Sequence, residues 1–416
     1  MSRTRLKRTV GNYVTGDRFF GREAELEWFI QHLDEGDHLL LVAQRRMGKT
    51  SLMHEASRRI ADRYICLHVD LQGSASAADA IAELSAATYK HQSLWAKTQE
   101  LFANALGRVA LNIESLQINE LKLSLRSGMT AGDWQSKGDR LLEILAASDK
   151  PVVVFCDEVP ILVSRMLKGD DYQITPERRQ QTDIWMSWLR GHCIRYQGKL
   201  RFVVTGSIGL EPLLRQAGLS ATINHFTPFD LQAWSGETAR HCWDALANEA
   251  QLQFDPGAQE RMLEAIGICI PYHVQMFFNH LYQSCRLEGR QTISVELVER
   301  VYQQKMLGVK GHADLSHLEE RLKLVVGRDQ HPMVLELLTE AAVVGTLTST
   351  SARTLCKTYG DAGNDAVLRE VLGILEHDGY LVRRDGAYAF ESHLLRDWWK
   401  AHYGFGYVPV SEREGQ

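Results

Sequence analysis

Residues 39–51 read Leu-Leu-Leu-Val-Ala-Gln-Arg-Arg-Met-Gly-Lys-Thr-Ser, a short apolar run followed by a loop that ends in Gly48-Lys49-Thr50. An apolar strand that leads through such a loop into a helix is typical of a phosphate-binding loop. There the backbone N–H groups face phosphates, a lysine bridges the β- and γ-oxygens, and a threonine hydroxyl ligates Mg²⁺. We therefore predict an ATP site with Lys49 on the phosphates and Thr50 on the metal. The loop residues expected to contact the nucleotide are Gln44, Arg45, Arg46, Met47, Gly48, Lys49, Thr50 and Ser51.

One loop position departs from the G-x-x-x-x-G-K-[ST] pattern, because Ala43 stands where the first glycine is usual. The small Cβ of alanine fits this turn as long as its φ stays negative. The alternative interpretation is a chance Gly-Lys-Thr in an ordinary strand–helix connection. A second motif elsewhere in the chain is needed to decide between the two.

That second motif is residues 152–158, Val-Val-Val-Phe-Cys-Asp-Glu, an apolar run that ends in two carboxylates. A carboxylate at the end of such a strand holds the Mg²⁺ shell, and its neighbour can polarise the attacking water. We assign Asp157 to the metal and Glu158 to the water. The alternative, a strand that merely exits into solvent through two acids, does not explain the phosphate loop. The pair predicts Mg²⁺-dependent hydrolysis of ATP to ADP and phosphate.

A third apolar run, Leu200–Thr205, is followed by Gly206-Ser207. In a parallel sheet its end lies beside the other strand ends, so Thr205 or Ser207 can reach the γ-phosphate or the attacking water. We give the catalytic assignment to Ser207. The alternative is a polar strand terminus with a turn glycine.

The pattern from residue 39 to 205 alternates buried strands with helices, which predicts an α/β P-loop NTPase fold with a parallel sheet covered on both faces. Residues 113–125 alternate apolar and polar side chains, so we expect a half-exposed strand or hairpin there. After Pro228 the strand signal fades and an all-α lid follows. The expected strands are Leu39–Val42, Ile65–Val69, Val152–Cys156 and Phe202–Thr205, and the expected helices are Ser51–Ala61, Ala78–Ala87, Thr182–Ile194, Gln232–Asn248, Pro256–Ile266, Tyr272–Glu288 and Val295–Lys305.

The C-terminal segment predicts a winged helix-turn-helix. Pro332–Val344 reads as a helix, Ser349 or Ser351 can cap a second, and Asp365 can cap a third that runs to His377. Asp385-Gly386 between two short apolar segments is a tight hairpin signal. A closing helix follows at residues 394–402.

The bulk composition excludes several classes of protein. Its 47 Lys+Arg and 52 Asp+Glu residues give a formal charge of −5, so there is no chain-wide basic field for nucleic acid. The apolar runs are far too short to span a membrane. Seven scattered cysteines without a C-x-x-C pair argue against a disulfide framework or a zinc ribbon, and a reducing cytoplasm fits best.

Residues 17–26, Asp-Arg-Phe-Phe-Gly-Arg-Glu-Ala-Glu-Leu, resemble the F-x-G-R-E-x-E-L opening of the STAND and archaeal-type predicted AAA+ P-loop ATPases. The Arg-Arg-x-Gly-Lys-Thr-Ser-Leu loop, the Asp-Glu strand end and Thr205-Gly206-Ser207 are similar to the same family. So are residues 267–272, an extended form of its lid G-x-P element, and residues 390–399, at the end of its winged helix.

The resemblance implies further site residues. Gly21 and Arg22, in the segment Gly21–Glu23, should lie near the adenine and ribose, and Pro271, with His273 beside it, should approach the nucleotide from the lid. An arginine finger acting on a neighbouring copy is implied at Arg215, with two arginines as competitors, Arg190 and Arg195. The implied domains are a basic N-terminal tail (1–16), an ATPase core (17–229), a helical lid (230–306), a linker rich in turns (307–331), a winged helix (332–404) and a C-terminal tail (405–416).

Two functions remain open at this point. The first is a slow AAA+/STAND-type switch ATPase, whose nucleotide state controls the lid and winged helix for binding a protein partner or for self-assembly. The alternative is a DNA-binding ATPase of the origin-recognition or transposition-helper type. The presumed recognition helix carries Asp365, Glu370 and Glu376 against Arg369, which opposes binding among phosphates, although Arg383-Arg384 lie in the wing. We favour the switch.

Overall fold

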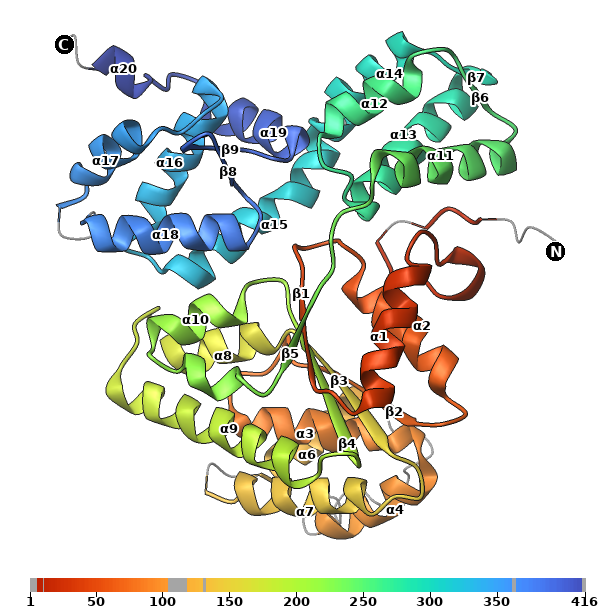
Figure 1. Cartoon of the computed structure of the whole chain (residues 1–416), viewed down its shortest axis with the longest axis vertical. Coiled ribbons are helices and arrows are strands. Elements are labelled where there is room, and N and C mark those ends of the chain that lie inside the picture. The colour runs from red at the N-terminus through yellow and green to blue at the C-terminus, as the bar shows by residue number, and fades with distance from the viewer. Residues whose placement is uncertain (1–5, 10, 104–117, 130–131, 361–363, 414–416) are drawn as a thin grey trace. The chain divides into compact units, whose positions relative to one another are not determined.

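The computed structural model describes residues 6–9, 11–103, 118–129, 132–360 and 364–413. The chain forms two compact units (Figure 1). The sheet unit comprises Ala24–Val42 and Leu52–Leu231, and the loop-lid unit comprises Met1–Glu23, Ala43–Ser51 and Gln232–Gln416. Among the described residues no helix has the length and apolar character needed to cross a bilayer. All seven cysteines lie in the described part and are free thiols.

A five-stranded sheet is the centre of the sheet unit, and every pairing in it is parallel, as predicted. The spatial order is β2-β3-β4-β1-β5, so the two strands with predicted catalytic ends are neighbours and the strand that leads into the phosphate loop lies next to them. Because all strands run the same way, their carboxyl ends share one edge. The strands are β1 (Leu39–Val42), β2 (Ile65–Asp70), β3 (Val152–Asp157), β4 (Leu200–Thr205) and β5 (Thr227–Asp230).

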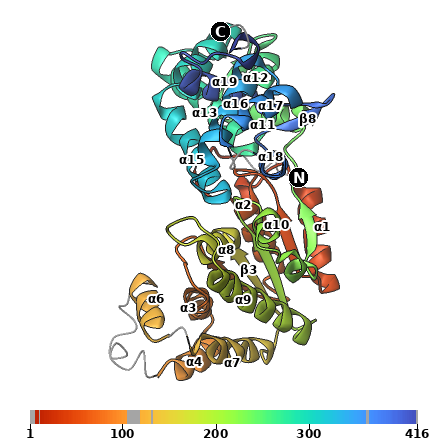
Figure 2. The ribbon, with the colours of Figure 1, turned by 90° about the vertical axis from the view of Figure 1, so that its left-hand side faces the viewer.

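Helices cover both faces of this sheet (Figure 2). On one face Phe155 of β3 stacks with Phe29 of α1, and with His68 of β2, which stacks in turn on His54 of α2. On the other face α3, α7 and α9 pack against the alternate side chains of the same strands. The described helices that lie wholly or mostly in this unit are α1 (Glu23–Glu35), α2 (Lys49–Ile60), α3 (Ala77–Ala87), α4 (Gln92–Leu101), α6 (Ile118–Ser127), α7 (Trp134–Ala146), α8 (Val159–Lys168), α9 (Pro176–Arg195) and α10 (Leu210–Gln216).

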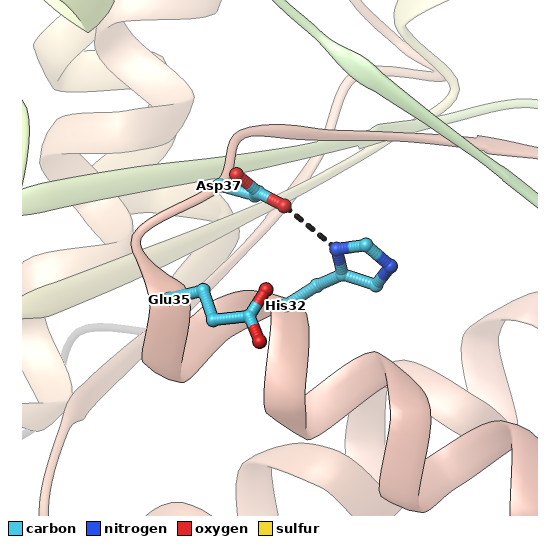
Figure 3. A group of neighbouring side chains, drawn as sticks. All are labelled: His32, Glu35 and Asp37. Carbon is cyan, nitrogen blue, oxygen red and sulfur yellow. Dashed lines mark hydrogen bonds and ion pairs between the residues drawn. The ribbon is translucent and has the colours of Figure 1, made fainter.

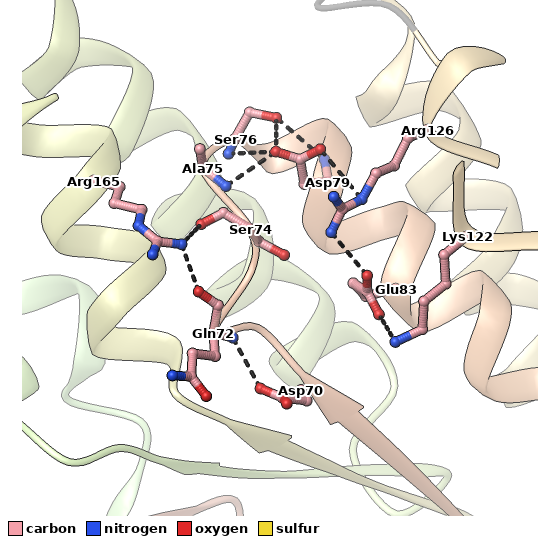
Figure 4. Close-up of polar contacts among 10 residues, drawn as sticks. All are labelled: Asp70, Gln72, Ser74, Ala75, Ser76, Asp79, Glu83, Lys122, Arg126 and Arg165. Atoms are coloured by element: carbon pink, nitrogen blue, oxygen red, sulfur yellow. Dashed lines mark hydrogen bonds and ion pairs between the residues drawn. The ribbon is translucent and has the colours of Figure 1, made fainter. Parts of the chain in front are cut away.

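The strand predicted over residues 113–125 is wrong for residues 118–125, which belong to helix α6; residues 113–117 lie outside the described part. Leu121 and Leu125 are one helical turn apart and buried. The basic side chains beside them pair with Glu83 of α3 (Figure 4), at 2.7 Å for Lys122 Nζ and 2.9 Å for Arg126 Nη2. Packing against α3 therefore overrides an alternation that both a strand and a helix can satisfy.

The loop-lid unit carries the predicted helical lid, with a two-residue parallel pair added to it. The turn-rich link expected at 307–331 is wrong, because helix α15 occupies most of it. Leu315, Leu322 and Val325 of that helix are buried at helical spacing. The elements are α11 (Gly236–Ala250), β6 (Gln253–Phe254), α12 (Ala258–Ile266), α13 (Pro271–Glu288), β7 (Thr292–Ile293), α14 (Val295–Val301), a π-helix at Tyr302–Met306 and α15 (Val309–Val326).

The C-terminal part of this unit has the predicted order of three helices, a hairpin and a closing helix. The hairpin turn has positive φ at Asp385 (49°) and Gly386 (82°), as a tight turn requires. The predicted caps are wrong by one residue or more, because Thr348 and Asn364 accept the hydrogen bonds of the helix starts. The elements are α16 (His331–Val344), α17 (Ser349–Lys357), α18 (Asp365–His377), β8 (Val382–Arg384), β9 (Ala387–Ala389), α19 (His393–Tyr403) and α20 (Val410–Arg413).

Candidate nucleotide site

The lysine of the phosphate loop is hydrogen-bonded to the backbone of the same loop. Lys49 opens α2, and its Nζ donates hydrogen bonds to the backbone oxygens of Ala43 (2.7 Å) and Gln44 (2.8 Å). The side chain is only 8% exposed, so it arches over the loop and does not extend into solvent. Gly48 has a φ of +93°, which favours glycine, and Ala43 does not have a positive φ. The alanine at the first position is thus compatible with the turn.

The N-terminal segment lines this loop within the loop-lid unit. The Val14 N–H donates to Ser51 Oγ at 3.1 Å, which assigns a structural contact to a hydroxyl that the sequence placed in the nucleotide site. Arg22 is buried, and its Nη2 donates to Met47 O at 3.3 Å and to Gln232 O at 2.6 Å. Arg22 therefore joins the loop to the start of the lid.

Gly21 has a reason to be glycine beyond any nucleotide contact. Its φ is +67°, and a Cβ there would lie 2.8 Å from Thr238 Cγ2 and 3.2 Å from the Trp234 ring. Phe20 beside it packs edge-on against Trp234, with ring centroids 5.8 Å apart. The Gly21-Arg22 pair predicted to lie near the adenine is thus packed against the loop and the first part of the lid.

In the sheet unit Asp157 ends β3 and Glu158 follows it, and both residues are half-buried. Glu158 adopts a left-handed backbone (φ +59°), which is uncommon for a residue other than glycine and is found often at functional sites. Its N–H donates to Asp157 Oδ1 at 3.0 Å. The turn thus separates the two carboxyl groups while tying the first to the backbone of the second.

The end of β4 holds the Glu158 carboxylate. Oε2 accepts a hydrogen bond from Ser207 N at 3.0 Å and another from Ser207 Oγ at 2.7 Å. Thr205, the other candidate, is fully buried and its hydroxyl donates to Leu41 O at 3.3 Å, so it serves the sheet. The structure brings Glu158 and Ser207 together. The sequence did not predict this contact, because it depends on β3 and β4 being neighbours in the sheet. A glutamate after one strand and a serine after its neighbour were the available signal.

The lid and finger candidates differ in their surroundings. Pro271 and His273 are buried in the first turn of α13, and the residue between them, Tyr272, carries the Arg46 guanidinium over its ring. Arg215 lies on α10, and its Nη1 is 3.6 Å from Glu211 Oε1. Its side chain is 54% exposed, which an arginine that contacts another molecule requires.

The two competing arginines make contacts within the sheet unit. Arg190 Nη1 donates to Ala221 O at 3.0 Å, and the Arg195 guanidinium lies 5.2 Å from the centre of the Tyr196 ring. Arg190 is half-buried, whereas Arg195 and Arg215 are both exposed, so exposure disfavours Arg190 and does not separate the other two candidates.

A second group of potential metal ligands was missed by the sequence reasoning: His32, Glu35 and Asp37, whose ligand atoms lie within 4.8 Å of one another (Figure 3). His32 Nδ1 is 2.6 Å from Asp37 Oδ2, and the Asp37 N–H donates to His32 O. This group precedes β1, whereas the phosphate loop follows it. It closes the turn between α1 and β1, and we assign it no metal.

Comparison with known structures identifies the fold. The Walker-type ATPase PABY2304 of Pyrococcus abyssi matches with a TM-score of 0.61 at 16% identity, over 94% of this chain and 99% of that one. The ORC2 protein of Aeropyrum pernix, solved as ADPNP-ADP complexes, matches with a TM-score of 0.53 at 14% identity, over 96% and 95% of the two chains. No family model and no curated protein sequence matches this chain. The chain therefore has the fold of P-loop ATPases, an α/β core followed by a helical lid and a winged helix, as predicted.

Proposed function

We propose that this protein binds ATP with Mg²⁺, hydrolyses it slowly, and uses its nucleotide state to control the lid and winged helix for a protein partner or for self-assembly. Lys49 holds the phosphates, Thr50 and Asp157 hold the metal, and Glu158 polarises the water. Ser207 orients the Glu158 carboxylate through its two hydrogen bonds. Similarity of fold supports the ATPase assignment by analogy, and the residues of the loop and strand ends give it chemical content.

The observation that carries the switch is a contact between the phosphate loop and the winged helix. Gly379 lies two residues after the end of α18 and has a φ of +74°, and a Cβ on it would lie 1.8 Å from Gln44 Nε2. The next residue, Tyr380, is buried and its hydroxyl donates to Leu318 O at 2.7 Å, which fixes the turn. The Gln44 side chain leaves no room for a Cβ at this turn, which supports the proposal that a change in the loop on binding phosphates is passed to the winged helix.

The experiment compares two glycine substitutions. Gly379→Ala places a methyl group into Gln44, whereas Gly345→Ala introduces alanine at a similar helix end (φ +93°) where nothing lies within 4 Å. We expect Gly379→Ala to speed the release of fluorescent ADP, by about tenfold for a lost contact of about 1.4 kcal/mol. Gly345→Ala should leave release unchanged.

Two further variants complete this test. Gln44→Ala removes the same contact from the loop side, so it should speed ADP release about as much as Gly379→Ala, and the double variant should release ADP no faster than either single variant. Equal release rates for the two glycine variants would contradict the switch.

Lys49→Ala tests the ATP assignment itself: we expect it to weaken Mg-ATP binding about 10- to 100-fold, because charge-assisted hydrogen bonds to the phosphates are lost. Unchanged ATP binding would contradict the site.

DNA binding remains the second candidate because Arg353, Lys357, Arg383 and Arg384 are all exposed on the winged helix. Arg384 pairs with Glu391 at 3.7 Å, which reduces its availability to phosphates. A salt titration of binding to random duplex DNA, with and without ATP, separates the two functions. Binding that falls steeply with salt and is lost in Arg383→Ala with Arg384→Ala would favour DNA.

A further inference from the structure

A second contact of the phosphate loop joins it to the lid. The Arg46 guanidinium carbon lies 3.7 Å from the centre of the Tyr272 ring, within the range of a cation–π interaction. Both side chains are half-buried. Tyr272 is the second residue of α13, the 18-residue helix that begins with Pro271, so the ring belongs to the longest helix between residues 230 and 306.

The backbone of Arg46 makes this contact informative. Its φ is +67°, a conformation that glycine adopts freely and a long side chain adopts at a cost in free energy. Glycine here would build the same loop without that cost. The arginine side chain therefore brings an interaction that offsets the strain, and the Tyr272 ring is where its charge lies.

The position of Arg46 gives its charge a second potential partner. It is three residues before Lys49, in a loop whose backbone amides face bound phosphates. Hydrogen bonds from a guanidinium to phosphate oxygens are stronger than a half-exposed cation–π interaction of the same group. Phosphates in the loop and the tyrosine ring on the lid thus compete for one guanidinium.

We propose that Arg46 is a lid-positioning residue with two alternative partners, the Tyr272 ring and the β- or γ-phosphate of the bound nucleotide. Bound phosphate draws the guanidinium away from the ring and releases the first turn of α13. This inference rests on the ATP binding proposed above and deepens it, because it names the residue through which the phosphates act on the lid.

Four variants test the competition. Tyr272→Leu removes the ring face, and Tyr272→Phe keeps it. Arg46→Asn removes the charge and tolerates the left-handed backbone. Tyr282→Leu is the matched control, because Tyr282 lies on the same helix with the Arg8 guanidinium 3.3 Å from its ring centre. Each variant is checked for folding by circular dichroism and titrated with Mg-ATP, ADP and AMP.

Removing the ring and removing the guanidinium should shift the affinity for Mg-ATP in opposite directions. Tyr272→Leu should bind Mg-ATP about 2- to 30-fold more tightly, the range that a cation–π contact represents at tenfold per 1.4 kcal/mol. Arg46→Asn should bind it more weakly. Tyr272→Phe and Tyr282→Leu should bind like the wild type, and AMP, which lacks the β- and γ-phosphates, should show no difference among the variants.

Amide hydrogen exchange in residues 271–288 provides a readout that does not depend on affinity. In the wild type Mg-ATP should increase exchange at the start of α13, and Tyr272→Leu should show that increase without nucleotide. Shifts of the same sign in Tyr272→Leu and Arg46→Asn, or identical behaviour of Tyr272→Leu and Tyr272→Phe, would overturn the proposal. A wild-type chain that binds no ATP would contradict the proposed function instead, and the nucleotide-free exchange of Tyr272→Leu would still report on the contact.

Discussion

The phosphate loop contacts residues that are much further away along the chain than the contacts made at the carboxyl edge of the sheet. In the loop, Gln44 meets Gly379 of the winged helix and Arg46 meets Tyr272 of the lid. At the edge, Glu158 is held by Ser207, which follows the strand next to its own, on a sheet whose strands are among the most buried parts of the chain. The contacts of the loop with the lid and the winged helix suit the switch proposed above, whereas the contacts of the edge stay within the sheet unit.

The largest expected effect tests the edge. Glu158→Gln keeps the size of the side chain and an oxygen that can accept the Ser207 hydrogen bonds, but it removes the charge proposed to polarise the water. We expect ATP turnover to fall about 10²- to 10³-fold while Mg-ATP binding stays within a few-fold of the wild type. Phosphate release and equilibrium binding measure the two quantities separately.

Asp70→Asn is the matched control for that experiment, because Asp70 ends the neighbouring strand β2 in register with Asp157. Its Oδ1 accepts a hydrogen bond from Gln72 N, which an asparagine oxygen can also accept. The control should turn over ATP like the wild type. If Glu158→Gln did so too, the general-base assignment would be wrong.

The same contrast explains how much of the molecule could be predicted from its sequence. The strand ends at Asp157 and Thr205 and the loop before Lys49 follow from local patterns, because buried parallel strands leave continuous apolar runs. The contacts between Glu158 and Ser207 and between Gln44 and Gly379 join residues distant in sequence, and no local pattern specifies them. Helix α6 was mistaken for a strand because the side chains that decide it, Glu83 among them, lie on another helix.

The next effect tests how tightly the edge is packed. A Cβ on Gly206, after β4, would lie 2.4 Å from Pro160 Cδ on α8. We expect Gly206→Ala to lower the free energy of unfolding by about 1–3 kcal/mol, because the ring cannot move without shifting the helix that follows Glu158. Denaturant unfolding measures this. In the control Gly191→Ala, on α9 with nothing within 4 Å, the substitution should raise it by about 0.5–1 kcal/mol. Equal changes in the free energy of unfolding for the two variants would mean that Pro160 and α8 can move to make room for the new methyl group.

The smallest effect concerns the pH dependence of the sheet unit. Burial, followed by the neighbouring His54 and Lys90, lowers the pKa of His68 from 6.5 to about 3. The folded state keeps this imidazole neutral, so between pH about 6.5 and about 3 the unfolded chain binds more protons and stability falls as the pH falls. His68→Leu should therefore reduce the slope of unfolding free energy against pH by about one proton, or about 1.4 kcal/mol per pH unit, between pH 6 and 4. Urea titrations at several pH values measure the slope. Parallel curves for variant and wild type would show that His68 keeps its ordinary pKa in the folded chain.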